Sequence, residues 1–157
     1  MASRILFVCM GNICRSPAAE AVMKAIVDPD DFVVESAGTH DYHVGDPPDP
    51  RMAAACQGRG IEMTSRGRHV DRSDLAPGVY DRVVAMDRGN LSALRGMFGG
   101  ELPEHVALFS QFLDGDWPDE VPDPYYGNAD GFELVLDMLQ AGCPTLLDDV
   151  LQRKADD

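Results

Sequence analysis

The sequence predicts an α/β fold: a single domain, residues 1–157, in which a four-stranded parallel sheet carries helices on both faces as a three-layer sandwich. Four short apolar runs lack the polar alternation of a half-exposed strand, as expected for strands buried on both faces of a parallel sheet. Segments with helical spacing lie between these runs, and 157 residues suit one domain with a sizeable core. The predicted strands are residues 5–8, 32–36, 80–86 and 106–109.

The first strand is followed by a short loop and then by a predicted helix over residues 18–27. Apolar residues recur at helical spacing from Ala18 onward. Pro17 is tolerated in a first helical turn, and Ser16 before it is able to cap the helix. The strands on either side of this helix therefore form a right-handed βαβ unit with a parallel pair.

The remaining elements follow from turn signals and periodicity. Further helices are predicted over residues 51–59, 87–97 and 129–151, the last of them interrupted at residues 142–144, where the chain has Gly142 and Pro144. Residues 114–127 are rich in Asp, Pro and Gly and show no period. A long irregular segment in a compact domain is often functional.

Composition limits the classes of partner. Thirteen basic residues against 27 acidic ones give a net charge of −14, which argues against nucleic acid or an anionic membrane as a partner. No stretch reaches the roughly 20 apolar residues of a membrane span, and residues 5–9 are too short for a signal peptide. Four unevenly spaced cysteines do not form a disulfide framework. We expect a monomer of the reducing cytoplasm.

The loop between the first strand and the first helix predicts an oxyanion site. Unpaired N–H groups and the positive end of the helix dipole favour an anion there. Cys9 opens the loop and Arg15 ends it. The thiolate is the nucleophilic form of cysteine, and the N–H donors and Arg15 favour it. The guanidinium fork of Arg15 can hold two phosphoryl oxygens. The predicted phosphate-binding loop is Met10, Gly11, Asn12, Ile13, Cys14 and Arg15.

Other interpretations of this loop fit the residues less well. The chain has no Gly-x-Gly-x-x-Gly for a dinucleotide here and no Gly-Lys-Ser/Thr ending for a nucleotide. Cys9 and Cys14 alone are too few ligands for a zinc site, since the other cysteines are distant and no His pair accompanies them. A cysteine after a buried strand can also be a small hydrophobe. The Cys-x5-Arg-Ser spacing between a strand and a helix favours the anion site, with neither metal nor cofactor.

A nucleophile that attacks a phosphate ester also needs an acid to protonate the leaving oxygen. The irregular segment offers several acidic residues. Asp123 stands out among them because the following proline biases it to an extended conformation and two aromatic residues come next. The candidates are Asp114, Asp116, Asp119, Glu120 and Asp123.

Two motifs resemble the signatures of one family. Val8-Cys9-Met10-Gly11-Asn12-Ile13-Cys14-Arg15-Ser16-Pro17 and Asp123-Pro124-Tyr125-Tyr126-Gly127 look like the two signatures of the low-molecular-weight protein tyrosine phosphatases. The resemblance covers nearly the whole chain. It implies a flavodoxin-like fold with strand order 2-1-3-4 and hydrolysis of phosphotyrosine in proteins and of small aryl phosphate monoesters through a phospho-cysteine.

The resemblance also assigns roles to individual residues. It implies that Asp123 is the general acid and then activates water, and that the Ser16 hydroxyl donates to the Cys9 thiolate. A plain helix cap at Ser16 remains the alternative. A network from Asn12 that uses Ser36 is expected to hold the strained loop. Many relatives have a histidine where this chain has Ser65, which leaves His69 as an unproven substitute.

Residues around the loop are expected to set specificity. Ile13, Tyr42, Tyr125 and Tyr126 are predicted walls for an aromatic ring, and stacking contributes about 0.5–1.5 kcal/mol per pair. Relatives often have Trp at the position of Tyr42. Relatives that act on phosphoarginine have Thr at the position of Ile13, so Ile13 favours phosphotyrosine. The histidines at positions 40, 43, 69 and 105 are otherwise expected to be ordinary surface or loop residues.

Three further hypotheses remain open at this point. A reversible disulfide between Cys9 and Cys14 would protect the nucleophile from overoxidation. An arsenate reductase shares the fold and loop, but it relays oxidation through a further cysteine pair, and residues 86–100 contain none. A non-enzymatic phosphate-binding or phosphocysteine adaptor would not need Asp123 or its tyrosines.

Overall fold

A computed structural model describes residues 2–125 and 127–156. Its sheet has the order β2-β1-β3-β4, and every neighbouring pair is parallel. The predicted fold class and the strand order implied by the family resemblance are therefore confirmed. The strands are β1 (Ser3–Cys9), β2 (Phe32–Gly38), β3 (Arg82–Ala85) and β4 (Val106–Leu108).

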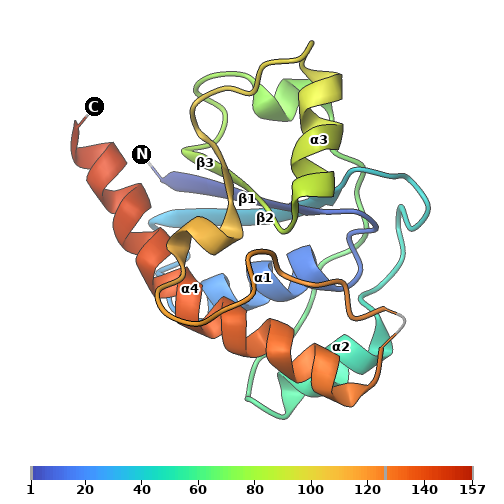
Figure 1. Ribbon diagram of the computed structural model, residues 1–157. Helices are drawn as coiled ribbons and strands as arrows, with labels where there is room; N and C mark the ends of the chain where they lie inside the picture. The colour runs from blue at the N-terminus through green and yellow to red at the C-terminus, as the bar shows by residue number, and fades with distance from the viewer. Residues whose placement is uncertain (1, 126, 157) are drawn as a thin grey trace.

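Helices cover both faces of the sheet (Figure 1). α1 (Arg15–Lys24) and α4 (Ala129–Asp156) lie on one face, α3 (Arg88–Met97) lies on the other, and α2 (Pro50–Gln57) packs beside α4. Two short 3₁₀ helices complete the chain, η1 (Arg72–Leu75) and η2 (Phe109–Phe112). Within the described residues, no helix is long and apolar enough to cross a membrane.

The central strand β1 divides the core in two. Ile5 and Phe7 belong to the buried cluster under α1 and α4, whereas Leu6 and Val8 belong to the cluster under α3. All four side chains are fully buried, as expected for an apolar run without polar alternation. Because strand side chains alternate, Cys9 at the end of β1 is on the α1 side, where the chain turns into that helix.

The first helix begins earlier than its periodicity suggests. α1 starts at Arg15 and ends at Lys24, and its N-cap position is Cys14, without a side-chain capping bond. Ser16 therefore lies inside the first turn, and the alternative of a plain helix cap is wrong. Its hydroxyl is turned toward the loop, where it contacts the Cys9 sulfur and Asn12.

The last helix runs unbroken through Pro144, so the predicted interruption is wrong. The missing N–H of Pro144 removes one intrahelical bond. Buried side chains on both sides of it, among them Leu139, Cys143 and Leu146, hold the helix against the core. Gly142 allows this approach, because a Cβ there would lie 2.6 Å from Cε2 and Cζ of Phe109, a fully buried ring in η2.

This contact predicts that Gly142→Ala destabilises the protein. Alanine is intrinsically better than glycine in a helix by about 1 kcal/mol. Overpacking against Phe109 should outweigh this gain and lower the free energy of unfolding by about 1–3 kcal/mol. The control is Gly96→Ala in α3, where an added Cβ meets nothing within 4 Å and should be neutral or stabilising. Urea unfolding of both variants is the measurement, and equal shifts for the two would contradict the steric explanation.

Candidate active site

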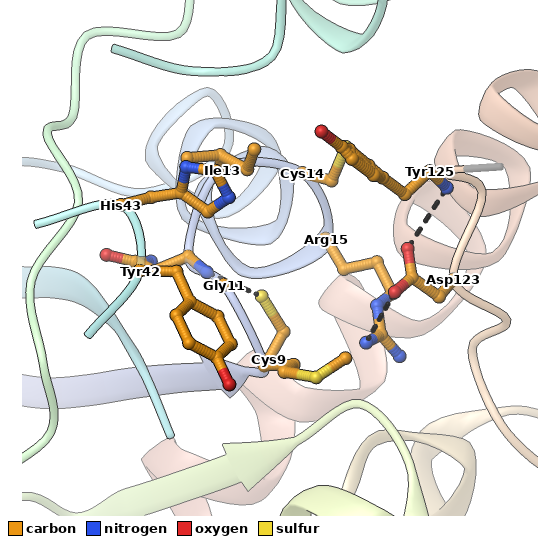
Figure 2. A pocket seen from close by; sticks show the side chains of 11 residues that line it. Cys9, Gly11, Ile13, Cys14, Arg15, Tyr42, His43, Asp123 and Tyr125 are labelled. Atoms are coloured by element: carbon orange, nitrogen blue, oxygen red, sulfur yellow. Dashed lines mark hydrogen bonds and ion pairs between the residues drawn. The ribbon is translucent and has the colours of Figure 1, made fainter. Parts of the chain in front are cut away.

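The loop between β1 and α1 forms the base of a pocket at the carboxyl end of the sheet (Figure 2). Tyr42 and His43 stand on one side of it, Asp123 and Tyr125 stand on the other, and Cys9 lies between them. The described lining residues are Cys9, Met10, Gly11, Asn12, Ile13, Cys14, Arg15, Tyr42, His43, Asp123 and Tyr125.

The Cys9 sulfur receives polar contacts from its own loop. The Asn12 N–H donates to Sγ at 3.3 Å, and the Ser16 hydroxyl lies 3.0 Å from it. Cys9 is 2% exposed, and α1 begins six residues later with the free N–H groups of a first helical turn. The first-turn N–H groups and the positive end of the helix dipole therefore face the loop that holds this sulfur.

Asn12 adopts the left-handed conformation, with φ of 58°. Two hydrogen bonds hold its buried side chain there: Nδ2 donates to Ser16 Oγ at 2.9 Å, and Oδ1 accepts from the Arg68 backbone N–H at 2.8 Å. Sequence reasoning missed Arg68, because any residue except proline can supply a backbone donor. The expected anchoring of Asn12 thus comes from the segment that runs beside the loop.

Ser36 does not support Asn12, and that expectation is wrong. Its hydroxyl donates to Glu20 Oε1 at 2.7 Å, while Lys24 pairs with Oε2 of the same carboxylate at 2.6 Å. Glu20 is 6% exposed and needs donors at that depth. His69 is not the substitute either, since its Nε2 lies 3.1 Å from the carbonyl oxygen of Thr39.

The outer side of the loop is bound by the segment that follows β2. The N–H groups of Thr39, His40 and Asp49 donate to the carbonyls of Cys9, Met10 and Ile13 at 2.9, 3.0 and 2.8 Å, respectively. With these carbonyls held outward, the loop can direct N–H groups toward the pocket. The segment after β2 therefore lies directly beside the Cys9 loop.

Gly38 is required for this close approach. A Cβ at position 38 would lie 2.8 Å from the Met10 carbonyl oxygen and 3.1 Å from Asn12 Cβ. Neither neighbour can move without reshaping the loop, since Asn12 already holds a strained φ.

Arg15 is a buried cation, 2% exposed, at the base of the pocket. Nη1 donates to Asp87 Oδ2 at 2.6 Å and to the Val121 carbonyl at 3.0 Å, and Nη2 lies 3.7 Å from Asp123 Oδ2. Burial opposes its charge, but Cys9, the hydrogen bond to Asp87 and the carboxylates of Asp87 and Asp123 together raise the pKa of Arg15 above its ordinary value. The guanidinium therefore stays charged in the pocket.

Asp87 was missed as a site residue, although it follows β3 after one intervening residue, at the same edge of the sheet as Cys9. One carboxylate oxygen accepts the Asn90 N–H at 2.7 Å and caps α3, and the other accepts from Arg15. The sequence feature that could have identified Asp87 is an aspartate at the expected start of the helix after the third strand.

Asp123 is the acidic candidate that the structure brings to the pocket. Its Oδ1 accepts the Tyr125 N–H at 3.1 Å, and its side chain is 36% exposed. Glu120 instead binds the backbone and side chain of Arg88. Among the described lining residues, Asp123 is the one carboxylate from residues 114–127.

The pocket rim contains three of the four predicted aromatic or aliphatic walls. Ile13, Tyr42 and Tyr125 line it, and Tyr42 is 72% exposed. Tyr126, the fourth, lies outside the described residues. His43 was expected to be an ordinary loop residue, but it lines the pocket, with its Nδ1 3.0 Å from Asp46 Oδ2.

Cys14 is buried at the N-cap of α1 and lines the same pocket as Cys9. Burial, followed by the charges of Asp49, Cys9 and Asp123, raises the pKa of the Cys14 thiol. Both cysteines are free.

Comparison with known proteins assigns the family. The family model described as low molecular weight phosphotyrosine protein phosphatase matches residues 4–156. The chain belongs to this family. A low molecular weight protein-tyrosine-phosphatase of Streptomyces coelicolor is 39% identical over 156 residues, which cover 94% of this chain and 93% of the relative.

Solved structures agree with this family assignment. A protein tyrosine phosphatase from Entamoeba histolytica, crystallised with Hepes in the active site, has a TM-score of 0.88 at 37% identity and covers 98% of this chain and 99% of that one. YfkJ from Bacillus subtilis has the same TM-score at 32% identity, with 98% of each chain covered. This member therefore has the family fold over nearly its whole length.

The contact between Arg15 and Asp87 leads to a stability prediction for this family member. Asp87→Asn keeps an oxygen that can cap α3 but leaves the buried Arg15 with a weaker partner. Loss of the charge-assisted bond should lower the free energy of unfolding by about 1.5–3 kcal/mol. The matched control is Asp137→Asn, which removes an exposed ion pair with Arg59 and should cost less than about 1 kcal/mol. Similar losses in urea unfolding for both variants would argue against the structural role of Asp87.

Proposed function

We propose that this protein hydrolyses phosphotyrosine in proteins, and small aryl phosphate monoesters, through a phospho-cysteine intermediate. Cys9 Sγ attacks phosphorus while the aryl oxygen leaves with the proton of Asp123. The Asp123 carboxylate then takes a proton from water, and the water oxygen attacks phosphorus. The P–S bond breaks, which regenerates the Cys9 thiolate and releases inorganic phosphate. No metal or cofactor enters either step.

The observation that carries this proposal is the convergence of Cys9, Arg15 and Asp123 on one pocket. Arg15 and the loop N–H groups can hold the equatorial phosphoryl oxygens, whose charge must be stabilised as the aryl oxygen departs. Asp123 stands at the open side of the pocket, where a leaving oxygen would lie (Figure 2). An adaptor that only binds phosphate would have no need for this carboxylate.

Support residues are proposed to act through the sulfur and the loop. The Ser16 hydroxyl lies where it can donate to the departing thiolate, and it is itself bound by the side chain of Asn12. Asn12 is proposed to keep the loop in its strained shape through its bond with the Arg68 N–H. The role of Ser16 is the one that the resemblance implies, whereas Asn12 is held through Arg68 and not through Ser36.

The substrate's aromatic ring is proposed to lie between Ile13, Tyr42 and Tyr125, with Tyr126 as a further wall. A phenyl ring would gain burial and stacking between these walls, and Ile13 offers no hydroxyl to a guanidinium phosphate. Partners are therefore phosphotyrosine-containing proteins.

The proposal also covers the domain organisation, the oligomeric state and the cellular location of the protein. We propose one phosphatase domain over residues 1–157 that acts as a monomer in the cytoplasm, without nucleic acid or membrane partners. Four free cysteines among the described residues and a net charge of −14 support this view.

Hydrolysis of p-nitrophenyl phosphate by three variants tests the reaction. Cys9→Ser should be inactive, because its hydroxyl is a far weaker nucleophile. Asp123→Asn should lose about 10²–10⁴-fold in kcat/KM, with the larger losses for esters of more basic phenols. Asp119→Asn, outside the lining residues, is the control and should keep full activity. An unaffected Asp123→Asn would favour a phosphate-binding adaptor, and turnover of arsenate with a thiol reductant would favour an arsenate reductase.

The redox role of Cys14 has its own test. Peroxide oxidises the Cys9 thiolate to a sulfenic acid with release of water. Attack by the Cys14 sulfur then forms the disulfide and releases a second water. Mass spectrometry after mild peroxide should show a Cys9–Cys14 disulfide that dithiothreitol reverses with recovery of activity. Cys14→Ser should instead give irreversible sulfinic or sulfonic Cys9, and sulfonic Cys9 in the wild type would refute a protective role.

A further inference from the structure

Arg51, in the first turn of α2, lies between two aromatic rings next to the pocket. Its Cζ is 5.2 Å from the ring centroid of Tyr125 and 4.9 Å from that of Phe132 in α4. A planar guanidinium can contact a ring through each of its two faces. The cation therefore joins the pocket rim to a helix of the core.

The position of Arg51 is itself fixed by Asp49, the N-cap of α2. Nε and Nη2 of Arg51 donate to Oδ1 and Oδ2 of Asp49 at 3.1 and 2.8 Å, and the Arg51 N–H donates to Oδ1 at 2.8 Å. Asp49 is 6% exposed, and its own N–H donates to the Ile13 carbonyl of the phosphate loop at 2.8 Å. This chain of bonds ties the guanidinium plane to the phosphate loop.

On the other side, Tyr125 connects Arg51 to the proposed general acid. The Tyr125 ring contacts Arg51, and the Tyr125 N–H donates to Asp123 Oδ1 at 3.1 Å. Asp123 Oδ2 is 3.7 Å from Arg15. Residues 114–125 contain no helix or strand, so contacts of this kind decide where the carboxylate stands.

We propose that Arg51 is a positioning residue that docks residues 123–125 against the phosphate loop, so that the general acid and the aromatic wall are placed together. This proposal rests on the proposed phosphatase function. Arg51 touches neither the sulfur nor the phosphate site. Its effect on Asp123 passes through Tyr125. Lysine cannot fully reproduce this effect, because an ammonium group lacks the planar guanidinium that contacts a ring and the paired N–H groups that bind both carboxylate oxygens of Asp49.

Two ester substrates with different leaving groups distinguish this positioning role from a general loss of activity or of folded protein. A general acid matters more for phenyl phosphate than for p-nitrophenyl phosphate, whose leaving oxygen is less basic. We expect Arg51→Met to lower the ratio of kcat/KM for phenyl phosphate to that for p-nitrophenyl phosphate by about tenfold, a part of the full effect of a general acid. Arg51→Lys should lower this ratio less, and Asp123→Asn should lower it most.

Arg59→Met is the matched control. Arg59 follows the same helix and also binds α4, through Glu133 at 2.7 Å and Asp137 at 2.9 Å. Among the contacts of the described residues, Arg59 has none with Tyr125 or Asp123, so its loss should lower stability and leave the ratio unchanged. Phe132→Leu, which removes the second ring that Arg51 contacts, should also lower the ratio. It provides the test if Arg51→Met does not fold.

The outcomes distinguish the two proposals. If Arg51→Met and Phe132→Leu keep the wild-type ratio, the positioning role is overturned even if KM for both esters rises. The same holds if Arg59→Met lowers the ratio as much as Arg51→Met. A wild-type protein that hydrolyses neither ester would instead overturn the proposed function, and the role of Arg51 with it.

Discussion

The whole site depends on one constraint: the loop between β1 and α1 must wrap around the Cys9 sulfur, and its carbonyl groups then need hydrogen-bond partners outside the pocket. Three N–H groups from residues 39–49, which come from the loop after β2, bind three of these carbonyls. Gly38 leaves room for the Met10 carbonyl and for Asn12. The parallel pairing of β1 and β2 brings these two loops to the same edge, so the sheet topology and the shape of the anion site have one cause.

The site also requires positive electrostatic potential, which the protein supplies only close to the pocket. A chain with net charge −14 repels a phosphate dianion at long range. The pocket offsets this with one buried guanidinium and oriented N–H groups, which act at short distance and with little screening. Asp87 accepts a hydrogen bond from Nη1 of that guanidinium and thereby orients it, at the cost of some of its positive potential.

Much of this arrangement could be predicted from the sequence, because its main parts are local in the chain. Cys9, Asn12 and Arg15 occupy a single strand–loop–helix segment, and the change in hydrophobic period marks its ends. Asp123 is distant, and the proline that follows it gave a hint that the family resemblance then made specific. The contact of Asp123 with Arg15 is consistent with both.

What could not be predicted has a physical reason in each case. Arg68 serves Asn12 through a backbone N–H, which leaves no trace in residue type. Ser36 was assigned to Asn12, but the buried carboxylate of Glu20 competes for its hydroxyl. Tertiary packing carries α4 through Pro144, against the local preference of proline.

The bond between the Arg68 N–H and the Asn12 side chain has a consequence for how this protein can vary. The loop depends on residue 68 only for its backbone N–H group. Selection for the shape of the loop therefore excludes proline at this position but constrains the side chain little. The guanidinium of Arg68 is then free to serve another purpose, and it binds Asp74 and the hydroxyl of Tyr80. Homologues can therefore exchange this side chain and its surface partners without altering how they bind an anion.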